Sequence, residues 1–243
     1  MITLYQFPPL WNLDNVSPFC LKMETYLKLA NIPHQVKIVN DPRRAPKGKL
    51  PFIKDGEHVI SDSGIIMDYL KHVYGDPLDD HLKSFRRAQG VAWQRLFEEH
   101  LYWVMVYSRW MDATNWPLVK ESFFRRAPLI LRSYIANRVR KNVRNALYAQ
   151  GMGRHSKDEI YKLGLDDLNA IKVVLTEQSY LLGDVITSVD AIGYAFLINI
   201  MNVPVESPLK EMAISTPCFQ HYCERVRDRL GSAAAVVNTL DGV

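Results

Sequence analysis

The sequence predicts an α+β chain of two domains, in which a small mixed domain precedes an all-helical one. Strand-like patterns occur only before residue 76, and helical spacing of apolar residues dominates from residue 82 onward. Runs of strands followed by runs of helices are typical of separate domains. We therefore expect one domain over residues 1–76, a second over 82–231 and a loosely docked tail over 232–243.

The strands of the first domain are short and alternate with helices. Residues 2–5 form the first expected strand and residues 35–39 the second. Residues 52–54 and 58–60 flank Asp55-Gly56, a dipeptide typical of a tight hairpin. With the two helices that follow from the capping signals below, the predicted order is β-α-β-β-β-α.

Both helices of the first domain begin at polar capping residues. Ser17 precedes Pro18, which suits the first helical position, and that helix is expected to end at Asn31. The second helix opens at Asp62 and ends at Gly75. Each helix start presents unpaired N–H groups and partial positive charge, which favour a bound anion.

The second domain contains long helical patterns. They cover residues 82–112, 128–150, 157–177, 187–201 and 217–230. Thr187 and Asp190 have the spacing of a capping box. The most apolar stretch, 191–205, is shorter than the ~20 residues that span a bilayer, so we expect a buried helix and no membrane span.

Cysteine usage favours a reducing compartment. The chain has three cysteines, which form no even disulfide framework, and its N-terminus lacks a charged-then-apolar leader. We therefore expect a cytoplasmic protein. Cys218, His221 and Cys223 suggest metal ligands, but three positions on one short helix do not close a tetrahedron, so no metal site is expected.

Positive charge is concentrated in one stretch, although the net charge is only +4. Residues 122–157 contain nine Lys or Arg and no Asp or Glu. Such a stretch could meet RNA or an anionic membrane surface. A solvated helix face that lends positive potential to a nearby anionic ligand is the interpretation we favour, and no nucleic-acid partner is expected.

The Ser17-Pro18-Phe19-Cys20 segment has the features of a thiolate site. An anionic sulfur at a helix start is stabilised by the N–H groups and the dipole. A cysteine in the first position would attack a disulfide itself, whereas a serine stabilises only a thiolate that a cosubstrate brings. That pattern indicates glutathione. In the alternative interpretation, Ser17 only caps its helix and Cys20 is a small buried hydrophobe.

The chain resembles the glutathione transferases over most of its length. The resemblance rests on the Ser17-to-Cys20 helix start, on Leu50-Pro51-Phe52 at the family's cis-proline, on the Asp62-Ser63 pair and on residues 180–190 with their capping box. It implies the glutathione transferase fold, with a thioredoxin-like N-terminal domain and an all-helical C-terminal domain. Within the superfamily, residues 98–103 and 151–160 resemble the failed-axon-connections and metaxin-like branch.

The resemblance implies roles for individual residues. Ser17 would be the catalytic residue that holds the glutathione thiolate. Leu50 and Pro51 would pair with the glutathione backbone, because an edge beside a cis-proline leaves a carbonyl and an N–H available. Asp62 would bind the ammonium and Ser63 the γ-glutamyl carboxylate.

A basic residue, Lys49 or Arg43, would meet the glycyl carboxylate. The family also implies a homodimer.

The expected reaction is conjugation of glutathione to a hydrophobic electrophile in detoxification. Its pocket would lie between the domains, with Trp11, Trp103 and Tyr107 as lining candidates. Cys20 could attack electrophiles itself, although it is expected to face the core. The alternative function is a non-catalytic interaction module, because metaxin-like relatives serve as membrane-import components.

Overall fold

The computed structural model describes residues 1–240, with side chains as far as residue 232. The N-terminal domain contains a four-stranded sheet in the order β2-β1-β3-β4, from β1 (Ile2–Gln6), β2 (His34–Ile38), β3 (Phe52–Asp55) and β4 (His58–Ser61). Strand β1 pairs parallel with β2 and antiparallel with β3, so Leu4 lies between Val36 and Ile53. The turn η1 (Pro42–Arg44) lies between β2 and β3.

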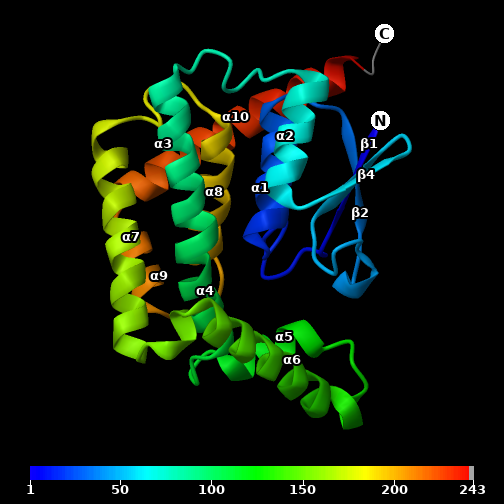
Figure 1. The fold of residues 1–243 in the computed structure, drawn as a ribbon, viewed down its shortest axis with the longest axis vertical. Helices are drawn as coiled ribbons and strands as arrows, with labels where there is room; N and C mark the ends of the chain where they lie inside the picture. The colour runs from blue at the N-terminus through cyan, green and yellow to red at the C-terminus, as the bar shows by residue number, and fades with distance from the viewer. Residues whose placement is uncertain (241–243) are drawn as a thin grey trace.

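Two helices join the sheet to the rest of the molecule. Helices α1 (Pro18–Leu29) and α2 (Ser63–Tyr74) lie between the sheet and the helical domain (Figure 1). Inward-facing Ile2, Leu4 and Ile53 are fully buried, as the period of two in a strand requires. On the opposite face Tyr5 stacks on Phe52, with 4.2 Å between ring centroids.

The C-terminal domain is helical throughout its described residues. It consists of α3 (Ser84–Arg95), η2 (Leu96–Leu101), α4 (Tyr102–Trp110), α5 (Trp116–Phe124), α6 (Leu129–Gln150), η3 (Met152–Arg154), α7 (Lys157–Glu177), α8 (Ser188–Met201), α9 (Pro208–Ser215) and α10 (Pro217–Leu240). Every residue of α8 is buried, and this helix packs against α1. The predicted fold class is therefore confirmed.

Helix α8 begins with the predicted capping box. Asp190 accepts hydrogen bonds from the backbone N–H and hydroxyl of Thr187, both at 2.8 Å. Its other oxygen accepts from the backbone N–H of Leu181 at 2.9 Å and from the hydroxyl of Tyr222. Burial nevertheless raises the pKa of this carboxyl to about 6. Asp190 thus ties the loop before α8 and helix α10 to the helix start.

The helices differ from the sequence prediction in three respects. The long helix expected over 82–112 is interrupted by η2, a π-helical segment. The short helices α5 and α9 were not predicted, because eight or nine residues give little periodic signal. Helix α10 continues to Leu240, so the backbone of the predicted tail is helical as far as the structure describes it, and 241–243 lie outside the described residues.

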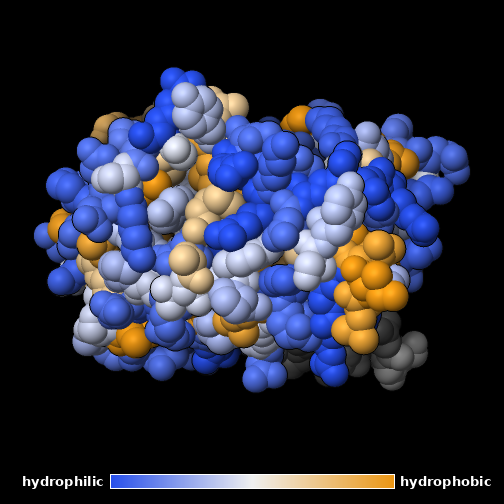
Figure 2. Space-filling view, turned by 90° about the horizontal axis from the view of Figure 1, so that it is seen from below, coloured by the Kyte–Doolittle hydropathy of each residue, from blue (hydrophilic) through white to orange (hydrophobic). Residues whose placement is uncertain are grey.

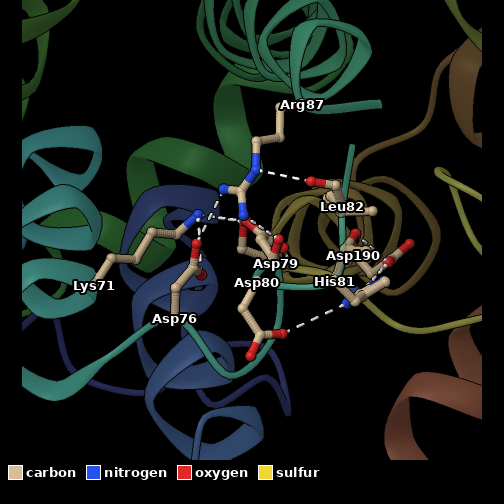
Figure 3. A network of polar contacts seen from close by, with 10 residues as sticks. Lys71, Asp76, Asp79, Asp80, His81, Leu82, Arg87 and Asp190 are labelled. Carbon is tan, nitrogen blue, oxygen red and sulfur yellow. Dashed lines mark hydrogen bonds and ion pairs between the residues drawn. The ribbon is translucent and has the colours of Figure 1, made fainter. Parts of the chain in front are cut away.

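The segment between α2 and α3 is held by a network of charges, shown in Figure 3. Asp79 accepts from the backbone N–H of Ser188 at 2.8 Å and from its hydroxyl, and it forms an ion pair with Lys71. Arg87 donates to the carbonyl oxygens of Asp79 and Leu82. These contacts attach the linker to the start of α8 and so set how the two domains meet.

Within the described residues, no helix is both long and apolar enough to cross a membrane.

Candidate active site

A cleft of about 1050 Å³ lies between the two domains. From the N-terminal domain it is lined by Ser17, Leu50, Pro51, Asp62 and Ser63. These are the residues for which the sequence predicted contacts with glutathione. They come from the starts of α1 and α2 and from the turn before β3, so the fold brings three separate segments to one place.

Ser17 is the N-cap of α1. Its backbone is extended, with φ −91° and ψ 116°, and its Oγ accepts a hydrogen bond from the N–H of Cys20 at 3.4 Å. A hydroxyl can accept and donate at the same time, so its proton is available for a second partner in the cleft. Capping and thiolate binding are therefore compatible roles for this one oxygen.

The loop that leads to Ser17 is held by a buried asparagine. The Nδ2 of Asn15 donates to the carbonyl of Phe7 at 2.8 Å, and its Oδ1 accepts from the N–H of Ser17 at 3.0 Å. Asn15 has no exposed surface. Its backbone carbonyl accepts from Nδ2 of Asn199 on α8, at 3.2 Å.

Arg109 on α4 reinforces the same loop from the helical domain. Its guanidinium donates to the carbonyl of Val16 at 2.6 Å and to both oxygens of Asn199 at 2.9 Å. Burial lowers the pKa of this guanidinium to about 10, so it still carries a charge at neutral pH. The helical domain thus fixes the position of Ser17, through contacts that the sequence pattern did not reveal.

Cys20 is fully buried behind Ser17. Burial raises the pKa of its thiol to about 12. A thiol with such a pKa is almost entirely protonated at neutral pH and is a poor nucleophile. Cys20 also does not line the cleft. The geometry therefore favours its role as a small hydrophobe next to Ala45 and Leu50.

The turn before β3 presents backbone groups to the cleft. The Leu50–Pro51 peptide bond is cis, as the resemblance implied. Within the described residues, the N–H and C=O of Leu50 have no hydrogen-bonding partner. This backbone is therefore free to pair with an extended peptide-like ligand.

Asp62 and Ser63 form the start of α2. Asp62 has φ +84°, an unusual value for a residue with a side chain, and its Oδ1 accepts from the N–H of Gly64 at 2.9 Å. The second carboxylate oxygen has no hydrogen-bonding partner among the described residues. Asp62 thus caps the helix with one oxygen and leaves the other for a cation in the cleft.

The opposite wall contains polar residues that the sequence did not single out as ligand contacts. Glu98 in η2 forms an ion pair with fully buried Lys22 of α1, and its Oε2 accepts from Nε2 of Gln94 at 2.9 Å. Burial lowers the pKa of Lys22, whereas the charge of Glu98 raises it in part. A Cβ on Gly64 would lie 3.3 Å from the Gln94 amide, so this wall directly faces the start of α2.

Basic residues stand at the mouth of the cleft. Lys47 and Lys49 line it, whereas Arg43 does not. Arg43 is instead held by Asp41 through contacts from Nε at 2.8 Å and Nη2 at 2.8 Å. Of the two residues considered for the glycyl carboxylate, the structure places Lys49 at the site.

The three aromatic candidates separate in the structure. Trp103 lines the cleft beside Tyr102, whose ring packs edge-on against Phe19. Trp11 lies outside the lining, because its Nε1 donates to Ser122 at 2.9 Å and its ring packs on Phe123. Tyr107 also lies outside it.

Tyr107 packs edge-on against Tyr161 of α7. Trp11 lies in the turn before α1 and Tyr107 on α4, and in neither case does the local sequence pattern say which neighbour the side chain meets. Tyr102, which directly precedes Trp103 in the sequence, lines the cleft although it was not among the predicted lining residues. Among the described residues no cluster of His, Cys, Asp or Glu has the geometry to hold a metal ion.

Two family models match the chain. The model for the glutathione S-transferase N-terminal domain covers residues 18–115, and the model for the C-terminal domain covers residues 164–226. The chain is also 31% identical to the isoprene-epoxide–glutathione S-transferase of Rhodococcus sp. (strain AD45), over 93% of this chain and 98% of that protein. The chain belongs to the glutathione transferase family.

Other relatives of this chain carry different names. The Failed axon connections protein of Drosophila melanogaster is 28% identical over 94% of this chain, which spans 58% of that protein. Metaxin-1 of Sus scrofa is 26% identical over 77% of this chain and 61% of its own length. The predicted similarity to the metaxin-like branch is thus confirmed.

Solved structures show the same fold. The β-etherase LigF from Sphingobium sp. strain SYK-6 superposes with a TM-score of 0.67 at 17% identity, covering 96% of this chain and 98% of that one. Glutathione S-transferase III in its apo form superposes with a TM-score of 0.62 at 18% identity, over 96% and 95% of the two chains. At such identities the likeness concerns the fold alone.

Proposed function

We propose that this family member is an active glutathione transferase that joins the glutathione thiolate to a hydrophobic electrophile. The observation that carries the proposal is the convergence of Ser17, the free Leu50 backbone and the free Asp62 oxygen on one cleft. In the reaction the bound thiol first releases its proton to solvent water. Its sulfur then forms a bond to carbon, and the electron pair of the broken bond leaves with the departing group or remains on a ring-opened oxygen, which takes a proton from water.

The start of α1 supplies the stabilisation that a thiolate needs. A thiol with a pKa of ~8.5 is a few per cent ionised at neutral pH, and lowering that pKa by about two units takes ~2.7 kcal/mol. A hydrogen bond to a charged group contributes ~1.5–3 kcal/mol and a helix dipole ~0.3–2 kcal/mol. The hydrogen bond from the Ser17 hydroxyl and the α1 dipole are therefore together large enough to lower the thiol pKa by this amount, and the proton can pass to solvent water without a general base.

The remaining groups bind the two charged ends of glutathione. The γ-glutamyl ammonium contacts the free oxygen of Asp62, and its carboxylate contacts Ser63 and the N–H groups at the start of α2. The glycyl carboxylate meets Lys49 at the mouth of the cleft. Leu50 pairs with the cysteinyl backbone, which places the sulfur near Ser17.

The electrophile occupies the side of the cleft formed by the helical domain. Trp103 and Tyr102 give this part apolar and aromatic surface. The name of the Rhodococcus relative directs the first assays to small epoxides, with an aryl halide as a general electrophile.

We place the enzyme in the cytoplasm as a homodimer, in which exposed Phe85 and Val91 of α3 supply apolar contact surface.

The rival function is a non-catalytic interaction module that retains the fold. The matches to metaxin-1 and to Failed axon connections favour it. Against it, each segment of the cleft carries a group that suits glutathione. Measured binding of glutathione separates the two functions.

The test is calorimetric titration with glutathione. We expect a dissociation constant between micromolar and millimolar, and Asp62→Asn should weaken it at least tenfold, because the ammonium loses its carboxylate. Asparagine is an equally good N-cap and tolerates positive φ, so this variant isolates the charge.

Asp41→Asn is the matched control, since Asp41 is the N-cap of η1 and lies outside the cleft lining. Its affinity should equal that of the wild type. An absence of heat at roughly ten millimolar glutathione would leave the interaction module as the better account.

A further inference from the structure

An apolar cluster projects from the lower end of the molecule. Leu129, Ile130 and Leu131 form the first turn of α6, and the side chains of Leu129 and Ile130 are 78% and 94% exposed. Figure 2 shows the cluster as an orange patch on the face seen from below. Single exposed apolar residues are common, but a contiguous group indicates a surface that is covered in function.

The exposed face of α6 continues this surface. Ile130, Tyr134, Lys141 and Tyr148 are separated by four, seven and seven residues, so they lie along one side of the helix. Tyr134 and Tyr148 are 64% and 59% exposed. The side chain of Arg138 belongs to the same exposed side. Apolar, aromatic and basic groups thus alternate along one face.

The surroundings of the cluster carry an excess of positive charge, of which only part is neutralised by ion pairs. Residues 122–157 carry nine Lys or Arg and no acidic residue. Glu121 takes Arg132 in an ion pair at 3.0 Å, whereas no ion pair within the described residues involves Arg125, Arg138, Lys141 or Arg144. The positive charge is therefore available to an external partner.

The apolar cluster and the positive charge around it favour one of three possible partners for this surface: a second copy of the chain, RNA or an anionic bilayer. A second copy placed against the same patch would bring two sets of cations together, which opposes association. RNA would match the charge but offers no apolar phase for Leu129 and Ile130. An anionic bilayer matches both, because its headgroups attract cations and its interface accepts apolar side chains.

We propose that the α5–α6 arm, residues 116–148, docks on an anionic lipid surface. Ile130 and Leu129 enter the interface, and Arg125, Arg138 and Lys141 contact the headgroups. The five side chains named for docking do not line the cleft, although Val143 of the same arm does. Substitutions at those five positions therefore test the arm without removing a group from the cleft. In this proposal the arm lies on the membrane surface and does not cross the bilayer.

The forces on the arm predict its behaviour. Each cation near an anionic leaflet increases affinity about fivefold, and the attraction is screened by salt within about 8 Å at physiological ionic strength. Binding should therefore require anionic lipid and decline with salt. The apolar cluster supplies the part of the affinity that salt does not remove.

The experiment is co-sedimentation of the full chain with lipid vesicles. One set contains phosphatidylcholine alone and the other adds about 30 mol% phosphatidylglycerol. We expect at least tenfold more bound protein on the anionic vesicles. Ile130→Ser with Leu129→Ser, and separately Arg138→Glu with Lys141→Glu, should each reduce this binding at least tenfold.

Matched controls remove the same kinds of side chain elsewhere. Val173 and Val185 are 60% and 56% exposed, so Val173→Ser with Val185→Ser should leave vesicle binding unchanged. Lys172→Glu with Arg229→Glu matches the charge reversal on α7 and α10. Circular dichroism of every variant checks that the fold is retained.

Three outcomes would overturn the proposal. The first is equal binding to both kinds of vesicle, or no binding to either. The second is binding to single-stranded RNA that Arg138→Glu with Lys141→Glu abolishes while vesicles do not compete. The third is a concentration-dependent dimer in light scattering that Ile130→Ser with Leu129→Ser disrupts, because the patch would then be an interface between copies.

Discussion

At the scale of single residues, the Ser17 hydroxyl caps α1 and, in the function we propose, also holds the thiolate. Its Oγ accepts from the N–H of Cys20, and because Ser17 lines the cleft its proton is available to donate to a ligand there. Neighbouring Cys20 is excluded from the chemistry by its environment, since burial raises the pKa of that thiol to about 12. Of these two residues, three positions apart, Ser17 therefore offers a hydroxyl to the cleft, whereas Cys20 is a protonated thiol in the core.

Ser17→Ala should raise the pKa of enzyme-bound glutathione by about one to two units, because the hydroxyl hydrogen bond to the thiolate is lost. Ultraviolet titration of the thiolate measures this shift, and kcat/KM should fall accordingly. Affinity for glutathione should change little, since the hydroxyl contacts only the sulfur.

Ser207→Ala is a matched control for the loss of a cap. Ser207 also precedes a proline and accepts from an N–H three residues on, that of Lys210 at 3.2 Å, but it lies outside the cleft lining. Both variants should lose about 1 kcal/mol of stability, and only Ser17→Ala should alter the thiolate pKa. Loss of activity in Cys20→Ala with retention in Ser17→Ala would reverse the roles.

At the scale of elements, the start of α1 is held in place by helices from the other domain. Arg109 of α4 and Asn199 of α8 donate to the backbone at Val16 and Asn15, directly before α1. The side chains of Arg109, Asn199 and Asn15 are buried, so the loop has little freedom to move. The precision of the site thus comes from packing between domains.

Asn15→Ala should raise the glutathione thiol pKa and lower kcat/KM about tenfold, because Ser17 loses the bond that holds its N–H. Stability should fall by about 1–3 kcal/mol, since the carbonyl of Phe7 is left without its donor. Stopped-flow titration of the thiolate and chemical denaturation measure the two effects.

Asn115→Ala is the control that separates a loss of Ser17 positioning from a general loss of protein stability. Asn115 is equally buried and joins the carbonyls of Ser108 and Glu206 far from the cleft. It should cost a similar amount of stability and leave the thiol pKa unchanged. Equal pKa shifts in the two asparagine variants would mean that the loop network does not position Ser17.

At the scale of the whole molecule, Asp79 joins the linker to the start of α8. Burial alone would raise the pKa of this carboxyl, but the hydrogen bonds from Lys71 and Ser188 lower it overall. Because the folded pKa lies below the ordinary value, the folded state binds fewer protons than the unfolded state. The stability from Asp79 is therefore present above about pH 4 and is lost as the pH falls through the lowered pKa.

Asp79→Asn should reduce the free energy of unfolding by about 2–4 kcal/mol at pH 7, because Lys71 loses a buried partner. The difference from wild type should shrink as the pH falls below about 4. Urea denaturation at several pH values measures it. Asp80→Asn, at an exposed neighbouring position, should show no such dependence, and a difference that stays constant with pH would contradict the assignment.

The local patterns of the sequence determined much of this protein. Strand alternation, Ser and Asp caps and the Thr187–Asp190 box depend on neighbours in the chain, so they predicted the order of the sheet domain and the start of α8. The Leu50–Pro51 cis bond and the contribution of Ser17 to a cleft came from recognising a family pattern.

Only the tertiary structure decided which distant residues meet. Of the three aromatic candidates Trp11, Trp103 and Tyr107, only Trp103 lines the cleft, because the direction of a side chain in space depends on how its segment packs against the rest of the fold. The supports from Arg109 and Asn15, and the Lys22–Glu98 pair, join residues far apart in the chain. Local propensity carries no information on such contacts, since their energy exists only once the domains have come together.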